Sequence, residues 1–138
     1  MTAELERAVS ALAGHSVCLC GGGRTLTGDG RGVAPLIALI DSGADLSGMS
    51  AADVVVGKAA ALLLAYAGVK EVYGKVMSDP AAEVLAKLVI PASWGERTPY
   101  IINRRGDGMC PMEIAVSGTD DPSEALSAVR AALEKMKK

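Results

Sequence analysis

The segment NRRGDGMCPME, residues 103–113, brings a thiol, two guanidinium groups and two carboxylates close together in the chain. Its glycines permit tight turns ahead of Cys110, and Pro111 indicates that a helix begins directly after the thiol. The N–H groups at a helix start attract anions, and arginine forks bind carboxylate or phosphate. The segment therefore predicts an anion-binding pocket. Its candidate ligand-binding residues are Asn103, Arg104, Arg105 and Cys110.

Cys110 has three interpretations that the sequence leaves open. A cysteine at a helix start beside arginines has a lowered pKa and behaves as a reactive thiol. It can equally line a pocket without reacting, or simply pack as a small apolar side chain. No histidine lies near it in the sequence to serve as a base. Cys110 is thus a candidate nucleophile but not an assigned one.

The three cysteines and His15 are enough in number for a zinc site, but their spacing argues against one. Cys18 and Cys20 share one face of a predicted strand, whereas His15 is an odd number of residues away and would point to the other face if the strand extends back to it. Cys110 would also have to come alongside that strand. We therefore expect neither a metal nor another cofactor.

Lys58 is a second candidate for chemistry, because it is the only charge between Asp53 and Lys70 in an apolar stretch. The surrounding VVVGKAA lacks the first glycine and the Ser or Thr of a phosphate-binding P-loop. A lysine in such a stretch must extend to solvent, pair with a carboxylate or face a ligand. With a depressed pKa it could also act as a base or nucleophile. These alternatives remain open at this point.

The composition places the chain among ordinary globular proteins. It has 138 residues, 50% of them hydrophobic and 22% charged, which suits a single domain over residues 1–138. A net charge of −2 and 3% aromatic residues argue against a nucleic-acid partner. The longest apolar run, residues 54–69, is shorter than the roughly 20 residues of a membrane span. With an odd number of cysteines and no secretory signal, we expect free thiols, no membrane partner and a cytoplasmic location.

Hydrophobic spacing and turn signals predict a mixed sheet covered by helices, an α/β fold. Three glycines favour a β-hairpin over residues 16–28. The strongest helix prediction begins at Ser50, has Asp53 in a capping-box position and ends at Gly68. The other predicted helices cover residues 3–13, 35–41, 79–88, 110–116 and 122–136, and the other strands 71–78, 89–94 and 98–103.

Three segments resemble domain-of-unknown-function family 1893. They are GRGVAPLIAL at residues 30–39, DVVVGKAAALLL at 53–64 and TPYIINRRGDGMCPMEIAVSG at 98–118. The resemblance extends from about Ser16 to the last helix. It implies a cytidine deaminase-like fold, a three-layer α/β/α sandwich with a mixed sheet.

The resemblance does not imply deaminase chemistry. Zinc deaminases need His or Cys before Ala-Glu at one helix start, and Pro-Cys-x-x-Cys at the next. The corresponding positions read Gly57-Lys58-Ala59 and residues 79–84, DPAAEV, so the zinc ligands are absent. Relatives of this fold hold a nucleobase or nucleoside in a pocket where these helices begin. Here that pocket would be bordered by Lys58, Ser78 and the 103–110 loop.

These observations predict a zinc-free deaminase-like domain that binds a small anionic, nucleotide-related molecule. Lys58, Arg104 and Arg105 would meet the ligand's charge, while Ser78 and Asn103 would supply hydrogen bonds. One alternative is a non-zinc enzyme with Cys110 or Lys58 as its nucleophile. Another is an interaction module without a ligand, because the apolar composition and the amphipathic last helix suit a homo-oligomer.

Overall fold

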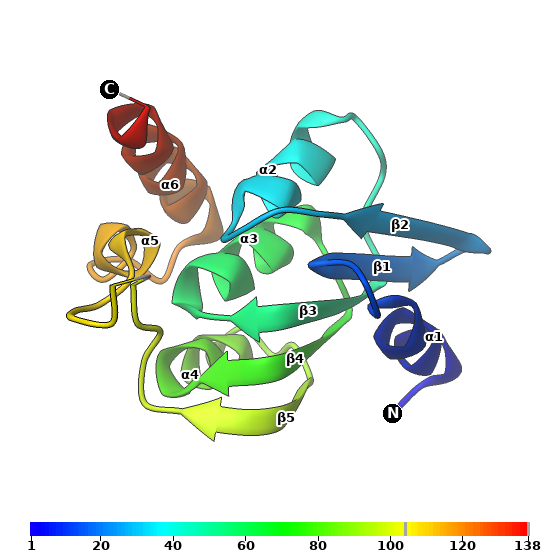
Figure 1. Ribbon diagram of the computed structural model, residues 1–138. Helices are drawn as coiled ribbons and strands as arrows, with labels where there is room; N and C mark the ends of the chain where they lie inside the picture. Colours follow the sequence, from blue (N-terminus) through cyan, green and yellow to red (C-terminus); the bar gives the residue numbers. More distant parts are fainter. Residues whose placement is uncertain (104, 138) are drawn as a thin grey trace.

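A computed structural model describes residues 1–103 and 105–137, which form a mixed sheet covered by helices (Figure 1). Within these residues the sheet has five strands in the order β2-β1-β3-β4-β5. The strand β1 pairs antiparallel with both β2 and β3, whereas β3, β4 and β5 run parallel. The strands are β1 (Val17–Gly21), β2 (Arg24–Gly28), β3 (Ser50–Val56), β4 (Glu71–Ser78) and β5 (Ala92–Thr98).

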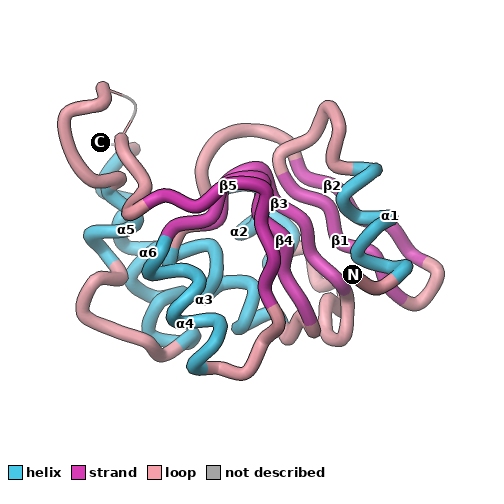
Figure 2. The backbone as a smooth tube through the Cα atoms, turned by 90° about the horizontal axis from the view of Figure 1, so that it is seen from below, coloured by secondary structure: helices cyan, strands magenta, loops and turns pink. Residues whose placement is uncertain are grey.

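The helices lie on both faces of the sheet (Figure 2). They are α1 (Ala3–Ala11), α2 (Ala34–Asp41), α3 (Lys58–Ala67), α4 (Asp79–Lys87), α5 (Pro111–Ala115) and α6 (Pro122–Met136). The first helix, α1, covers one face, where Cys18, Cys20 and Ala52 are buried beneath it. The helices α3 and α4 cover the opposite face. No helix among the described residues has the length and hydropathy that crossing a membrane requires.

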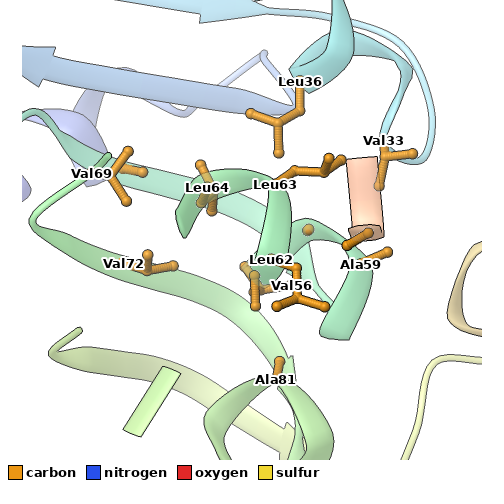
Figure 3. Packing of buried hydrophobic residues seen from close by; sticks show 14 of the residues in the cluster. Val33, Leu36, Val56, Ala59, Leu62, Leu63, Leu64, Val69, Val72 and Ala81 are labelled. Carbon is orange, nitrogen blue, oxygen red and sulfur yellow. The ribbon is translucent and has the colours of Figure 1, made fainter. Parts of the chain in front are cut away.

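The main hydrophobic core surrounds α3, which is the central helix (Figure 3). Leu62, Leu63 and Leu64 are consecutive and fully buried, so different sides of α3 are packed against other parts of the fold. Val72 approaches from β4 and Leu36 from α2. A helix that is apolar on all sides must be enclosed in this way to stay out of water. The expected buried central helix is therefore confirmed for residues 58–67.

The prediction that this helix begins at Ser50 is wrong, because residues 50–56 form β3. The strand lies in the middle of the sheet, between β1 and β4, and both of its faces are covered. A strand in that position reads as a continuous apolar run, which resembles a buried helix in sequence. Ser50 does not cap a helix; its hydroxyl donates to Glu71 at 2.6 Å. Gly57 is the residue that precedes α3.

The predicted hairpin and the helices at both ends of the chain are confirmed. The strand predicted over residues 89–94 instead begins at Ala92, because Val89 has a positive φ of 61° after α4. Residues 98–103 do not form a strand beyond β5. They contribute one isolated bridge, Ile102 to Met109, in the long segment between β5 and α5 (Figure 1). Pro91 and Pro99 lie directly before and after β5, which is consistent with the strand beginning and ending between them.

Candidate functional site

A cavity of about 300 Å³ lies where β3 meets α3. Its apolar wall includes Val33, Ala60, Ile101 and Met112, from four separate segments of the chain. Its polar groups include Asp53 on β3, Cys110 and Glu113 at α5, Arg31 in the loop before α2, and His15 before β1. The fold thus brings residues far apart in sequence to one apolar hollow with a few polar groups, as ligand pockets have.

Asp53 is a buried carboxyl in this cavity, with the residue only 9% exposed. It lies opposite Val17 of β1 and Gly74 of β4, in the middle of the sheet. Its Oδ1 accepts a hydrogen bond from the Val55 N–H at 3.3 Å. No lysine, arginine or histidine in the described part of the chain forms an ion pair with it. Burial raises the pKa of Asp53 to about 7, so near neutral pH this carboxyl can both donate and accept.

Glu113 holds the start of α3 from the neighbouring short helix. Its Oε1 accepts from the Lys58 N–H at 2.7 Å, and its Oε2 accepts from the Ala59 N–H at 2.9 Å. These N–H groups are unpaired within α3 and carry the positive end of its dipole, which a carboxylate satisfies. A side chain at Gly57 would place its Cβ 2.5 Å from Glu113 Oε1. A side chain at position 57 would therefore have to displace the Glu113 carboxylate from this position.

Lys58 forms an ion pair and does not line the cavity. Its Nζ lies 2.9 Å from Asp120 Oδ1, and Lys87 Nζ lies 2.6 Å from Oδ2 of the same carboxylate. The hydrogen bonds from Lys87 and then Lys58 lower the pKa of Asp120 to about 2. Of the alternatives that the sequence left open, the structure places Lys58 in a carboxylate pair. Its ammonium joins the start of α3 to the segment before α6.

The other predicted ligand-binding residues mostly serve the local structure. Ser78 is fully buried, and its Oγ accepts from the Ala81 N–H at 3.2 Å, which caps α4. Asn103 shapes a turn: its Oδ1 accepts from the Gly106 N–H at 2.9 Å, and its amide donates to Asp107. The Arg105 side chain is 84% exposed.

Arg104 lies outside the described residues. Cys110 is half-buried at the start of α5 and is the predicted residue that lies in the cavity wall.

The sequence profile of a domain of unknown function, DUF1893, matches residues 8–133. The chain belongs to the DUF1893 family. It is similar to the crystal structure of a DUF1893 family protein (TM1506) from Thermotoga maritima, with a TM-score of 0.83 and 28% sequence identity. The match covers 98% of this chain and 92% of that one. Among curated proteins, none matches this chain.

The residues of this DUF1893 domain do not fit a zinc ion at the start of α3. Gly57 and Ala59 offer no ligating side chain, and both oxygens of the Glu113 carboxylate are bonded to the Lys58 and Ala59 N–H groups. In the described part of the chain no three His, Cys, Asp or Glu residues are arranged to hold a metal. Cys18 and Cys20 lie under α1, away from the cavity, and burial together with Cys20 raises the pKa of the Cys18 thiol to about 11.

Asp53, Glu113 and Arg31 are polar cavity residues that sequence reasoning missed as site residues. Asp53 looked like a helix-capping residue because its strand resembled a helix. Glu113 left a weaker signal: α3 begins after a glycine, with no Ser, Thr, Asn or Asp to cap it. A helix start without a local cap needs an acceptor from elsewhere. The sequence does not say which carboxylate supplies it.

Proposed function

We propose that this DUF1893 domain is a zinc-free domain with a cytidine deaminase-like fold that binds a small nucleotide-related molecule beside α3. The observation that carries this proposal is the buried Asp53 carboxyl, which faces the cavity with no charged partner among the described residues. A buried ionisable group in an apolar hollow is a feature of functional sites. The cavity volume of about 300 Å³ falls within the range of small-molecule pockets.

The charges around the cavity indicate how such a molecule would be oriented. Lys58 is paired with Asp120, so it does not supply the anion contact that the sequence suggested. Arg31 is exposed and borders the cavity, where a phosphate could meet it in solvent. The heterocyclic part would lie inside, against Val33, Ala60 and Met112. The ligand would thus present an uncharged or donor-rich ring to Asp53 and its anionic part to the rim.

The parallel strands β3, β4 and β5 support the deaminase-like part of the proposal. The helices α3 and α4 each follow one of these strands, in the places where zinc deaminases carry their metal ligands. In this chain a carboxylate from Glu113 and a hydroxyl from Ser78 cap those helices instead. These caps support the proposal of a pocket in that place without the zinc ligands.

The test uses a variant that blocks the cavity and one that does not. Val55 lines the cavity and is 42% exposed, so Val55→Trp adds bulk at the rim without filling the core. Tyr66→Trp is the control, at an exposed position on α3 outside the cavity wall. Native mass spectrometry and thermal shift would be recorded with nucleosides and their monophosphates. We expect at least one compound to bind the wild type and Tyr66→Trp but not Val55→Trp.

The proposal fails if the wild type binds no nucleoside or nucleotide at millimolar concentration. It also fails if Val55→Trp binds the same compounds with unchanged affinity. A small molecule that stays with the protein during purification would appear as added mass in the native spectrum. Loss of that mass in Val55→Trp would place it in the cavity.

A further inference from the structure

Asp53 retains hydrogen-bonding capacity that the described residues leave unused. A carboxylate has about four acceptor positions, and the contacts found for this one are backbone N–H groups of its own strand, Val55 at 3.3 Å and Val54. The residue is nine-tenths buried in a central strand, where bulk water does not surround it. A buried polar group of this kind is costly unless something bonds to it.

The charged and titratable groups around the cavity do not supply that partner. Glu113, from α5, is engaged with the N–H groups of α3 and is itself acidic. His15, before β1, directs Nδ1 to Asp29 at 2.7 Å. Arg31 borders the cavity from the loop before α2 and is exposed, and Cys110 carries a thiol. The cavity thus has two carboxyl groups inside and its arginine at the edge.

The chemistry of a carboxylate decides what would satisfy Asp53. When ionised it only accepts, and its two oxygens match two N–H groups that lie side by side. The apolar walls at Val33, Ala60 and Met112 keep water from competing with such a pair. The nearby Glu113 carboxylate disfavours an anionic group at the same depth. A ring with two neighbouring donors meets all three conditions.

We infer that Asp53 recognises a ligand edge with two neighbouring N–H donors, such as an amidinium or the 2-amino-lactam edge of a purine. This inference rests on the proposed function, because it concerns the same cavity. The sequence suggested that basic side chains bind the ligand, whereas in this inference the group that recognises it is acidic. Recognition by the ionised carboxylate would also release a proton near neutral pH, because burial otherwise favours its protonated form.

The experiment compares guanosine with inosine, which lacks only the 2-amino donor. Isothermal titration of the full chain at pH 8 should give guanosine an affinity about tenfold or more higher than that of inosine. Benzamidine and benzamide make the same comparison on a smaller ring. Benzamidine has two neighbouring N–H donors, whereas benzamide has a carbonyl oxygen in place of one of them, so benzamidine should bind more tightly. Asp53→Asn should abolish both preferences, while Glu96→Gln, an exposed acid on β5, should leave them unchanged. At pH 7, the binding heat should depend on the buffer's ionisation enthalpy.

The comparison between ligands on the wild-type protein needs no variant to fold. If neither donor-rich compound binds more tightly than its partner while other nucleosides still bind, the inference is wrong and the proposed function stands. If the preference persists in a folded Asp53→Asn protein, Asp53 is not the recognition group. If no nucleoside or amidine binds at all, the proposed function falls together with the inference.

Discussion

The protonation of Asp53 should make the stability of this protein fall as the pH rises through neutrality. In the unfolded chain this carboxyl has the ordinary pKa of 3.8, whereas burial raises it to about 7 in the folded protein. Between these values the folded state binds a proton that the unfolded state does not. The stabilising contribution is therefore complete below pH 3.8 and is lost as the pH rises through 7.

The size of the effect follows from the difference between the two pKa values. Integrating the proton-linkage relation from pH 5 to pH 7 gives a loss of about 2 kcal/mol in the free energy of unfolding. The amide side chain introduced by Asp53→Asn has nearly the same shape as the protonated acid and carries no titrating proton. The free energy of unfolding of the variant should therefore lack this decrease between pH 5 and pH 7.

Urea denaturation of both proteins at intervals from pH 5 to pH 8 measures the effect. Groups that lie far from Asp53 are shared by the two proteins and cancel in the difference. The unfolding free energy of Asp53→Asn minus that of the wild type should rise by about 2 kcal/mol between pH 5 and pH 7. Parallel curves for the two proteins would refute the reasoning, because Asp53 would then not titrate in this range.

Two further predictions concern the neighbouring residues. Gly57→Ala should cost about 1–3 kcal/mol in urea denaturation, because its Cβ would meet the Glu113 carboxylate, while Gly118→Ala has open space and should be nearly neutral. Removing the carboxylate with Glu113→Ala should make the added cost of Gly57→Ala small, and full additivity would contradict the contact. In the native protein Cys110 should react with a thiol reagent before the two buried cysteines, and equal rates for all three thiols would contradict their burial. A Cys110 rate well above that of free cysteine would favour the nucleophile alternative.

Elements bounded by clear turn or helix-capping residues could be predicted from the sequence. The glycines at 21–23 indicated the hairpin, and the Asp-Pro pairs at 79–80 and 121–122 indicated the starts of α4 and α6. The boundary between β3 and α3 could not be predicted in this way. Residues 50–67 are apolar throughout most of their length, so neither a period of two nor one of 3.6 separates the strand from the helix. Only the pairing of β3 with β1 and β4 does so.

The site was predictable to a smaller extent. Cys110 does lie in the cavity wall, and the proline after it marks the start of α5, as the sequence indicated. Lys58 was noticed because a lone charge in an apolar stretch must be accommodated, but its carboxylate partner, Asp120, lies far along the chain. The position of Asp53 at the cavity depends on which face of β3 it occupies, and its register with Val17 and Gly74 fixes that face. Such long-range pairings leave no local pattern in a single sequence.

The contact between Gly57 and Glu113 connects these observations. The strand β3 passes into α3 through Gly57 alone, so a local cap for the helix would have to be a side chain at that position. Its Cβ would lie 2.5 Å from the Glu113 carboxylate, and a local and a distant cap are therefore mutually exclusive. The chain uses the distant one, which fixes α5 against the start of α3.

That distant cap also shapes the cavity. Its two hydrogen bonds, at 2.7 and 2.9 Å, hold α5 against α3 and so keep Ile101, Cys110 and Met112 in the cavity wall. A serine at position 57 would be a favourable cap in most helices. Here it would displace Glu113 and open the wall, so the glycine preserves the cavity rather than the helix.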